Sequence, residues 1–381
     1  MTMTIADPDI CSADPTIRWS ELGFAFTPTQ HMFVAQAHLL KEKDAPRGGA
    51  NGRNPEHKKD RYFWRKGRVQ TLRPLRLSPA AAVLNYGQAI FEGMKAQRTP
   101  DGRIVLFRPE MNAQRFQSSA ERLKMPAYPV DKFIAAVESL VRQEAAYVPP
   151  YAVEGWPEKC LPGSRSLYIR PVMLGSGPML GVQPAQAYTF YIYVSPVGVY
   201  RNEGKLVVLD ETHRAPRYGT GNVKAASNYP ITLQPYQQAK ERGYEDVLYL
   251  DARQDRYIEE VGSSNFFAIL KDGTIVTPKL GSILPGITRD SVITIARDLF
   301  HWAVEERDIT LEEVFDDGVE AFYTGTAAVI VPVTDIHYRK RDKAFAATGA
   351  DSRTQRLKEK LRAIQTCQAP DTFGWVHEVK L

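Results

Sequence analysis

The first half of the chain alternates between short apolar runs and amphipathic stretches. Continuous apolar or aromatic runs predict strands, and apolar residues three and four positions apart predict helices. Pro109 suits the first turn of a helix, and Asn112, Phe116 and Leu123 would share one face of it. Asp131 is placed to cap a second helix. The strands predicted here are 104–107, 167–174 and 187–197, and the polar residues 41–60 predict a loop.

The second half mixes the same two patterns without the regular strand–helix alternation of a doubly wound sheet. Residues 266–270 and 274–276, separated by Asp272-Gly273, predict a β-hairpin. Thr288 is placed to cap a helix, and residues 353–366 predict a final amphipathic helix. Further strands are predicted at 206–210, 246–250, 319–323 and 329–333. This mixture favours the α+β class.

Length and turn chemistry predict two domains. A chain of 381 residues is long for a single hydrophobic core. The stretch from Pro196 to Gly204 has the turn residues of a connection between domains. The predicted division is residues 1–197, a connecting loop at 198–204, and residues 205–381.

Composition is that of an ordinary globular protein, with 43% hydrophobic and 24% charged residues. The net charge of +5 is scattered and does not indicate nucleic-acid binding. No run approaches about 18 apolar residues, so no membrane span is predicted. Cys11, Cys160 and Cys367 lack the spacing of a disulfide framework or a zinc site, and residues 1–13 lack an apolar run. We therefore expect a cytoplasmic protein without a bound metal.

The stretch from Gly219 to Tyr229 holds one lysine, Lys224, among small residues. Glycine and asparagine allow tight or left-handed backbone conformations, so this lysine is expected on a shaped loop. One interpretation is a solvated surface lysine, which is the more frequent case. The other is a lysine whose amine condenses with a carbonyl group. The loop alone does not decide between them.

Four features elsewhere in the chain are each ambiguous alone. The helix expected after Leu284-Pro-Gly286 has free amides at its N-terminus, which form either a plain helix end or a phosphate site. Arg115, beside an apolar helical stripe, pairs either with a protein carboxylate or with an anionic ligand. Glu260 follows a strand, and Thr324–Ala328 is a small-residue turn. No GxxxxGK, GxGxxG, GxSxG or HExxH motif competes. With the lysine, these features form the inventory of a pyridoxal 5'-phosphate (PLP) site.

The same features lie in strings that resemble the branched-chain amino acid aminotransferases of PLP fold type IV, from about Gly23 to Val376. The resemblance implies a smaller N-terminal α/β domain, a larger C-terminal domain with a barrel-like sheet, and an active site between them. The strings are Tyr86 with Phe91-Glu-Gly-Met-Lys95, Leu106-Phe-Arg-Pro109 with Arg115, Leu167-Tyr-Ile-Arg-Pro171, Gly221-Asn-Val-Lys224 with Asn228-Tyr229, Glu260-Val-Gly262 with Asn265, Leu284-Pro-Gly286, and Tyr323-Thr-Gly-Thr-Ala327.

The resemblance implies a role for each matching residue. Lys224 is expected to bind the cofactor covalently, with Tyr229 at its phenolic oxygen and Glu260 at its pyridine nitrogen. Glu259 is then a solvated neighbour. The cofactor phosphate is expected to meet Arg115, Arg214, Thr326 and the amides of Ile287 and Thr288. The substrate α-carboxylate is expected at Thr326 and Ala327, and its side chain among Phe24, Tyr86, Phe91, Tyr168, Arg170 and Tyr200, some of which reach across a dimer interface.

The activity implied is transfer of the amino group of leucine, isoleucine or valine to 2-oxoglutarate by a homodimer, giving branched 2-oxo acids and L-glutamate. Arg170 with tyrosine hydroxyls is expected to meet the distal carboxylate of 2-oxoglutarate. A D-amino acid or amine transaminase, or a lyase acting on aminodeoxychorismate, would keep the fold and cofactor, and Tyr86, Tyr168 and Arg170 argue against these. A non-catalytic protein that binds PLP is a rival of another class, and an intact Lys224 and Glu260 argue against it.

Overall fold

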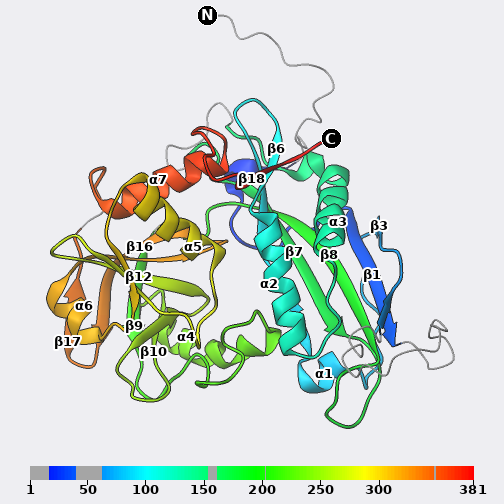
Figure 1. The fold of residues 1–381 in the computed structure, drawn as a ribbon, viewed down its shortest axis with the longest axis horizontal. Coiled ribbons are helices and arrows are strands. Elements are labelled where there is room, and N and C mark those ends of the chain that lie inside the picture. Colours follow the sequence, from blue (N-terminus) through cyan, green and yellow to red (C-terminus); the bar gives the residue numbers. More distant parts are fainter. Residues whose placement is uncertain (1–16, 40–61, 153–160, 202, 347–348) are drawn as a thin grey trace, which may run out of the picture.

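The computed structural model describes residues 17–39, 62–152, 161–201, 203–346 and 349–381. Two nine-stranded sheets, each with helices packed on it, form the two halves of the molecule in Figure 1. This mixture of sheets and helices confirms the predicted α+β class. The loop predicted at 41–60 lies outside the described residues. Among the described helices, none is long and apolar enough to cross a membrane.

The first sheet runs in the order β18-β6-β5-β7-β8-β1-β2, with β3 beside β1 and β4 beside β7. Its predicted strands are all present, because runs of β-branched and aromatic residues pack well on a pleated surface. The strands are β1 (His31–Leu39), β2 (Tyr62–Trp64), β3 (Arg68–Thr71), β4 (Ala89–Phe91), β5 (Met94–Arg98), β6 (Ile104–Phe107), β7 (Ser166–Gly175), β8 (Ala187–Val197) and β18 (Val376–Val379).

Two helices pack against this sheet, and a short one, α1 (Ala82–Tyr86), precedes β4. α2 (Pro109–Arg122) begins at its proline as predicted, because a first-turn residue needs no N–H donor. The prediction that Asp131 caps the next helix was wrong. α3 (Val130–Gln143) begins one residue earlier, and Asp131 lies in its first turn, where a carboxylate still favours the positive helix end.

The second sheet closes into a six-stranded barrel. The order β11-β10-β9-β16-β15-β12 returns to its start because β11 also pairs with β12, and closure leaves these strands no free edge. β13 and β14 extend from β12, and β17 pairs with β16. The bounds are β9 (Gly204–Val208), β10 (Asp246–Leu250), β11 (Ile258–Val261), β12 (Ser264–Leu270), β13 (Ile275–Pro278), β14 (Val304–Arg307), β15 (Gly318–Gly325), β16 (Val329–Tyr338) and β17 (Arg341–Ala344).

Four α-helices belong to this half, and the predicted cap of one of them was wrong. α5 begins at Ile287 with Gly286 as its N-cap, so Thr288 is already inside the helix. A Cβ on Gly286 would lie 2.0 Å from Asn265 Oδ1, so a glycine is required where the chain turns into the helix. The helices are α4 (Leu233–Glu241), α5 (Ile287–Thr294), α6 (Leu311–Asp317) and α7 (Arg353–Gln365), with a π-helical turn at Ile295–Leu299 and 3-10 turns at Ala226–Asn228 and Pro230–Thr232. Two further 3-10 turns, Trp19–Glu21 and Ala145–Tyr147, belong to the first half.

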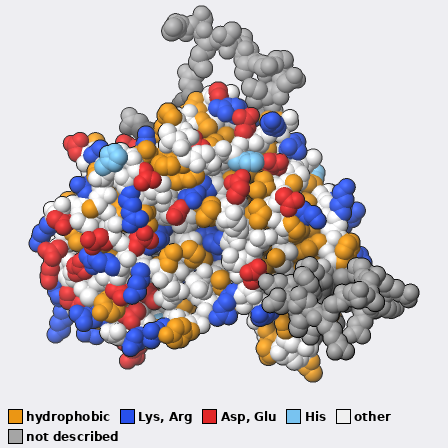
Figure 2. All heavy atoms as spheres, viewed as in Figure 1, with side chains coloured by type: hydrophobic (Ala, Val, Ile, Leu, Met, Phe, Trp, Pro, Cys, Tyr) orange, Lys and Arg blue, Asp and Glu red, His pale blue; other side chains and the backbone are white. Residues whose placement is uncertain are grey.

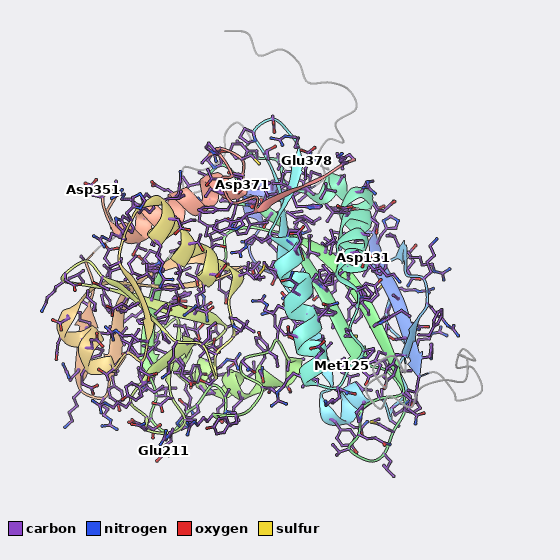
Figure 3. The ribbon with its side chains drawn as sticks, viewed as in Figure 1. Met125, Asp131, Glu211, Asp351, Asp371 and Glu378 are labelled. Carbon is purple, nitrogen blue, oxygen red and sulfur yellow. The ribbon has the colours of Figure 1, made fainter. Side chains whose placement is uncertain are left out.

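The last strand, β18, returns to the first sheet and pairs with β6 in antiparallel register. Glu378 on β18 accepts a 3.0 Å hydrogen bond from Arg103 Nη1. Figure 3 labels Glu378 and Asp371 on this return, at the same edge of the molecule. The chain therefore crosses between its two halves twice, once after β8 and once after α7.

Candidate active site

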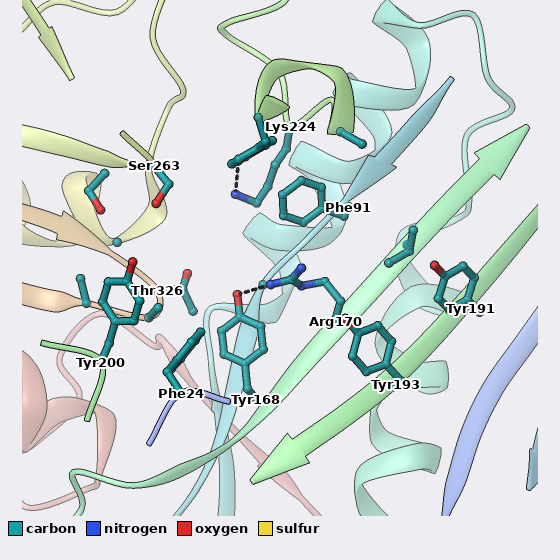
Figure 4. A pocket seen from close by; sticks show the side chains of 18 residues that line it. Phe24, Phe91, Tyr168, Arg170, Tyr191, Tyr193, Tyr200, Lys224, Ser263 and Thr326 are labelled. Atoms are coloured by element: carbon teal, nitrogen blue, oxygen red, sulfur yellow. Dashed lines mark hydrogen bonds between the residues drawn. The ribbon is translucent and has the colours of Figure 1, made fainter. Parts of the chain in front are cut away.

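A pocket of about 560 Å³ lies between the two sheets (Figure 4). Both halves of the molecule line it, so the pocket exists only because the chain folds them against each other. The first half and the connecting segment contribute Phe24, Phe91, Gly93, Tyr168, Arg170, Val172, Tyr191, Tyr193 and Tyr200, and the second half contributes Lys224, Ala226, Tyr229, Ser263, Ser264, Gly325, Thr326, Ala327 and Ala328.

Lys224 is half-buried in this pocket rather than solvated on the surface. Its Nζ lies 3.1 Å from the hydroxyl oxygen of Tyr229 and 4.8 Å from the centre of the Phe91 ring. The backbone of the loop is held from both sides: its amide donates to Ser119 Oγ at 3.0 Å, and its carbonyl accepts from the Phe91 amide at 3.2 Å. The amine is therefore presented at a fixed position inside the pocket.

Glu260 and Arg214 form a buried pair next to this lysine loop. The side chains are 2% and 4% exposed, and Arg214 Nε lies 3.4 Å from Glu260 Oε1. Arg214 also donates to the carbonyls of Gly262 and Asn228, and its guanidinium lies 5.1 Å from the centre of the Tyr229 ring. Its contacts are thus with the carboxylate and the tyrosine, and not with the start of α5, where the resemblance suggested a phosphate.

The carboxyl group of Glu260 has unused capacity to accept a proton or a hydrogen bond. Among the described residues, Oε1 has no hydrogen-bond partner although it is buried. Burial raises the pKa of Glu260 to about 7, and Arg214 opposes this only in part. A carboxyl group in this state suits a ligand that brings a positively charged N–H.

The raised pKa of Glu260 predicts a pH-dependent stability of the cofactor-free protein. The carboxyl titrates near 4.5 in an unfolded chain and near 7 when folded, so the folded protein binds more protons in between and loses stability as pH rises. Between pH 5 and pH 8 the free energy of unfolding of the wild type should fall, relative to Glu260→Gln, by up to about 3 kcal/mol. Urea unfolding at both pH values measures this. Equal pH dependence in the two proteins would contradict it.

Glu259 was predicted to be solvated, and this was wrong. The residue is 8% exposed and accepts a hydrogen bond from Ser282 Oγ. β11 is buried on both faces, so the two neighbouring carboxylates point to opposite sides of the strand without either reaching bulk water. Burial raises the pKa of Glu259 as well.

The start of α5 and Thr326 enclose a small cavity of about 30 Å³ beside the main pocket. Ile287 and Thr288 line it, and Thr326 lines both cavities and so joins them. No described side chain caps the first turn of α5, so its amides are available to an anion. The free amides and threonine hydroxyls fit a phosphate group at this end of the pocket.

Arg115 lies at the same end, and its protein partner is Glu92. Arg115 Nε lies 2.7 Å from Glu92 Oε1, and Nη2 lies 2.8 Å from Oε2. Nη1 donates to the carbonyl of Pro285, directly before the α5 cap, at 2.9 Å. The sequence reasoning gave Arg115 a possible protein carboxylate without naming it; the only signal was a glutamate beside Phe91 in a matching string.

Three further residues at the site were also not predicted. Tyr191 and Tyr193 extend the pocket beyond Arg170, and their positions on alternate residues of β8 were the available signal. Lys95 donates from Nζ to the carbonyl of Ala327 at 3.1 Å. Burial, with Arg362 nearby, lowers the pKa of Lys95 to about 7.

Tyr86 is the predicted pocket residue that the structure places elsewhere. It ends α1, is 41% exposed, and donates its hydroxyl to the carbonyl of Leu180. Gly87 ends the helix in a left-handed conformation with φ of 65° and directs the chain onward into β4. Within one chain, Tyr86 therefore lies on the surface and not in the pocket.

Comparison with known proteins places this geometry among enzymes. Residues 89–336 match the family described as amino-transferase class IV. The chain is 42% identical to branched-chain amino acid aminotransferase 2, chloroplastic, from Humulus lupulus, over 95% of this chain and 82% of that protein. It is 40% identical to branched-chain amino acid aminotransferase 1, mitochondrial, of the same plant, over 95% and 84%. Both names specify an organelle, which contradicts the expectation of a cytoplasmic protein; that expectation rested only on cysteine spacing and residues 1–13.

Solved structures of branched-chain amino acid aminotransferases also match this fold. The crystal structure of the Escherichia coli branched-chain amino acid aminotransferase matches with a TM-score of 0.69 and 26% identity, over 82% of this chain and 97% of that one. Other solved structures that match include branched-chain amino acid aminotransferases complexed with N-(5'-phosphopyridoxyl)-L-glutamate and with pyridoxamine 5'-phosphate, at TM-scores of 0.67 and with 27% and 28% identity. PLP is therefore the cofactor of the family to which the site is compared.

Proposed function

Because this chain belongs to the class IV aminotransferases, we propose that it moves the amino group of leucine, isoleucine and valine to 2-oxoglutarate with PLP as its cofactor. The observation that carries the proposal is the placement of the Lys224 amine against the Tyr229 hydroxyl. A buried carboxyl group whose Oε1 accepts no hydrogen bond, Glu260, is linked to this loop through Arg214. The uncapped start of α5 borders a small cavity that shares Thr326 with the pocket.

The residues present fit the cofactor along its whole length. The amides of Ile287 and Thr288, with Thr326 and Arg115, would hold the phosphate; Tyr229 would meet the phenolic oxygen and Glu260 the ring nitrogen. Lys224 would hold the carbonyl carbon. When bound, PLP supplies an electron sink for the negative charge that develops at the substrate Cα.

Lys224 is proposed to move the proton. With PLP and substrate bound, the uncombined Nζ of Lys224 would take the proton from the substrate Cα and hold it for its return during the transfer. The Tyr229 hydroxyl, 3.1 Å from Nζ, fixes where the amine starts. Glu260 favours the positively charged form of the group it meets, because a buried anion stabilises a neighbouring cation.

Arg170 is proposed to bind the distal carboxylate of 2-oxoglutarate. Its guanidinium lies 4.9 Å from the centre of the Phe91 ring and 5.2 Å from that of Tyr168, and Nη2 donates to the Tyr168 hydroxyl at 3.3 Å. Held flat against aromatic rings, the cation leaves the middle of the pocket to a branched apolar side chain. Its remaining N–H donors are available when a carboxylate enters instead. The amides of Thr326 and Ala327 would receive the α-carboxylate of either substrate.

A homodimer is proposed in which Tyr86 lines the pocket of the other subunit. Tyr86 lies in a cluster of exposed hydrophobic residues near α1, with Leu84 60% exposed, Leu180 92% and Val182 85%. Figure 2 shows hydrophobic side chains gathered at this lower end of the molecule. Contiguous apolar surface of this kind is typical of protein–protein contacts. The contact would bring Tyr86 to the position that the resemblance implies.

The division into residues 1–197 and 205–381, joined by 198–204, is kept as a proposal. In its support, β1 to β8 precede the connection and form one sheet, and β9 to β17 form the other. β18 is the exception, since it follows the barrel in sequence and joins the first sheet. The connection also carries Tyr200, which lines the pocket between the two halves.

A panel of amino donors tests the proposed substrate class. We expect the PLP-loaded enzyme to form glutamate from 2-oxoglutarate with L-leucine, L-isoleucine and L-valine, and to use D-alanine and an aryl amine poorly. Methionine, unbranched and of similar size, tests how strictly branching is read; a methylene-sized difference in an apolar pocket discriminates only about 10- to 200-fold. Activity confined to D-alanine or to the aryl amine would overturn the proposal.

A further inference from the structure

The tripeptide Phe91-Glu92-Gly93, which runs from the last residue of β4 to the start of β5, contacts three different parts of the site. Phe91 donates its amide to the carbonyl of Lys224 and places its ring 4.8 Å from the lysine amine. At Gly93 a Cβ would lie 2.1 Å from the Tyr168 hydroxyl oxygen, so only glycine leaves room for that phenol. Glu92 points to neither of these residues and is completely buried.

Hydrogen bonds fix both the side chain and the backbone of Glu92. Its carboxylate accepts two bonds from Arg115, one from Asn112 Nδ2 at 2.8 Å and one from the Gly93 amide at 3.2 Å. Its own amide donates to the carbonyl of Pro171 at 2.8 Å. Burial raises the pKa of Glu92, but Arg115, Lys224 and Asn112 together lower it by more, so the pKa lies below its usual value. The carboxylate is thus an ionised anchor that already accepts four hydrogen bonds within the protein.

The arrangement leaves a defined part of Arg115 free. A guanidinium carries five N–H donors in a rigid plane. Nε and one N–H of Nη2 are used by Glu92, and one N–H of Nη1 is used by the Pro285 carbonyl. One donor on Nη1 and one on Nη2 remain without a partner among the described residues. The Nη1 contact with Pro285, the residue before the Gly286 cap, places the guanidinium beside the start of α5.

We propose that Glu92 is a positioning residue for the cofactor phosphate: it fixes the Arg115 guanidinium so that its two remaining N–H donors meet the phosphate held at the start of α5. This rests on the proposed function in one respect, that the phosphate is the one carried by PLP. Glu92 itself contacts neither cofactor nor substrate. It acts through Arg115, and Asn112 and Gly93 keep it in place.

If the charge of Glu92 acted only through long-range electrostatics, its removal would have the opposite effect on phosphate binding. The two explanations can therefore be distinguished by experiment. Removing a negative charge near an anionic phosphate should tighten phosphate binding if only long-range electrostatics mattered. Removing the anchor should weaken it if orientation matters, because Glu92→Gln offers Arg115 one acceptor oxygen and sets an N–H₂ group against its other donor.

Binding of PLP and of pyridoxal, which lacks the phosphate, is compared in the wild type, Glu92→Gln, Arg115→Met and the double variant. We expect Glu92→Gln to raise the dissociation constant for PLP about tenfold or more, the loss typical of a charge-assisted hydrogen bond, and to leave that for pyridoxal nearly unchanged. In the Arg115→Met background the same change should have little further effect, since coupled residues are not additive.

Several outcomes would overturn the role of Glu92: unchanged or tighter PLP binding in Glu92→Gln, an equal loss for PLP and pyridoxal, or a full further loss in the Arg115→Met background. If Glu92→Gln does not fold, Glu92→Asp replaces it, because it keeps the charge and withdraws the carboxylate by one methylene; the same selective loss of PLP binding is expected. A wild type that bound neither compound would overturn the proposed function and the role of Glu92 with it, whereas a wild type that binds PLP separates the two.

Discussion

Replacing Lys224 by alanine is expected to abolish transamination while the protein still binds PLP. Lys224 is the lysine that lines the large pocket within the described chain, and its amine has two tasks in the proposed reaction, as covalent anchor and as proton carrier. The second task alone contributes about 10²- to 10⁴-fold in enzymes of known mechanism, so kcat should fall by about 10⁴-fold or more. The amides of α5, Arg115 and Glu260 are untouched, so PLP should stay bound without a covalent link.

Lys95 is the matched control for this variant. Its amine also lies at the site, 3.1 Å from the carbonyl of Ala327, and its pKa, lowered to about 7, leaves much of this amine unprotonated and nucleophilic at neutral pH. The position of Lys95 argues against a covalent bond to the cofactor, because Lys95 lines the small cavity and not the pocket that admits substrate. Borohydride reduction of the PLP-loaded protein should therefore label the peptide that contains Lys224. A label on the Lys95 peptide, or turnover near the wild-type rate in Lys224→Ala, would contradict the assignment.

Local sequence patterns were sufficient to predict most of the strands and helices. β6, β8 and β10 have the bounds that their apolar runs predicted, and α2 begins at its proline. The two helix caps were wrong for tertiary reasons. Asp131 is not the cap because the chain already turns into α3 at Pro129. Thr288 is not the cap because Asn265, from β12, requires a glycine at the turn into α5. A cap is chosen by what the chain meets in space as well as by its own side chain.

The same distinction between local and tertiary contacts applies to the residues of the site. Lys224 and Tyr229 are five residues apart, and their contact follows from one loop. The partner of Arg115 comes from a segment between two strands of the sheet that α2 covers, and Tyr191 and Tyr193 reach the pocket from β8, which was predicted only as a strand. Such contacts depend on which strands become neighbours, and the barrel pairs β9 with β16, far apart in the chain. Tyr86 is a different case: within one chain it lies on the surface, and only the proposed dimer contact would bring it to a pocket.

Glu260→Gln is expected to lower kcat by about 10²- to 10³-fold, the loss that follows removal of one fixed electrostatic group at a reacting centre. The carboxylate is 2% exposed, and its Oε1, although paired with Arg214, accepts no hydrogen bond among the described residues, so it can still meet the ring nitrogen of the cofactor. Glutamine keeps the shape but cannot favour a protonated nitrogen in the same way. The rate should fall with leucine and with glutamate alike, since the electron sink serves both half-reactions.

Glu259→Gln supplies the control, because it neutralises the adjacent carboxylate on the opposite side of the same buried strand. If burying a neutral side chain in β11 were what harms the enzyme, both variants would lose activity and stability together. If the charge at the ring nitrogen is what matters, Glu260→Gln alone should lose turnover while PLP binding persists through the phosphate. Single-turnover rates of each half-reaction, measured on PLP-loaded protein, separate these cases. A Glu260→Gln enzyme as fast as Glu259→Gln would show that the reaction does not depend on a protonated ring nitrogen.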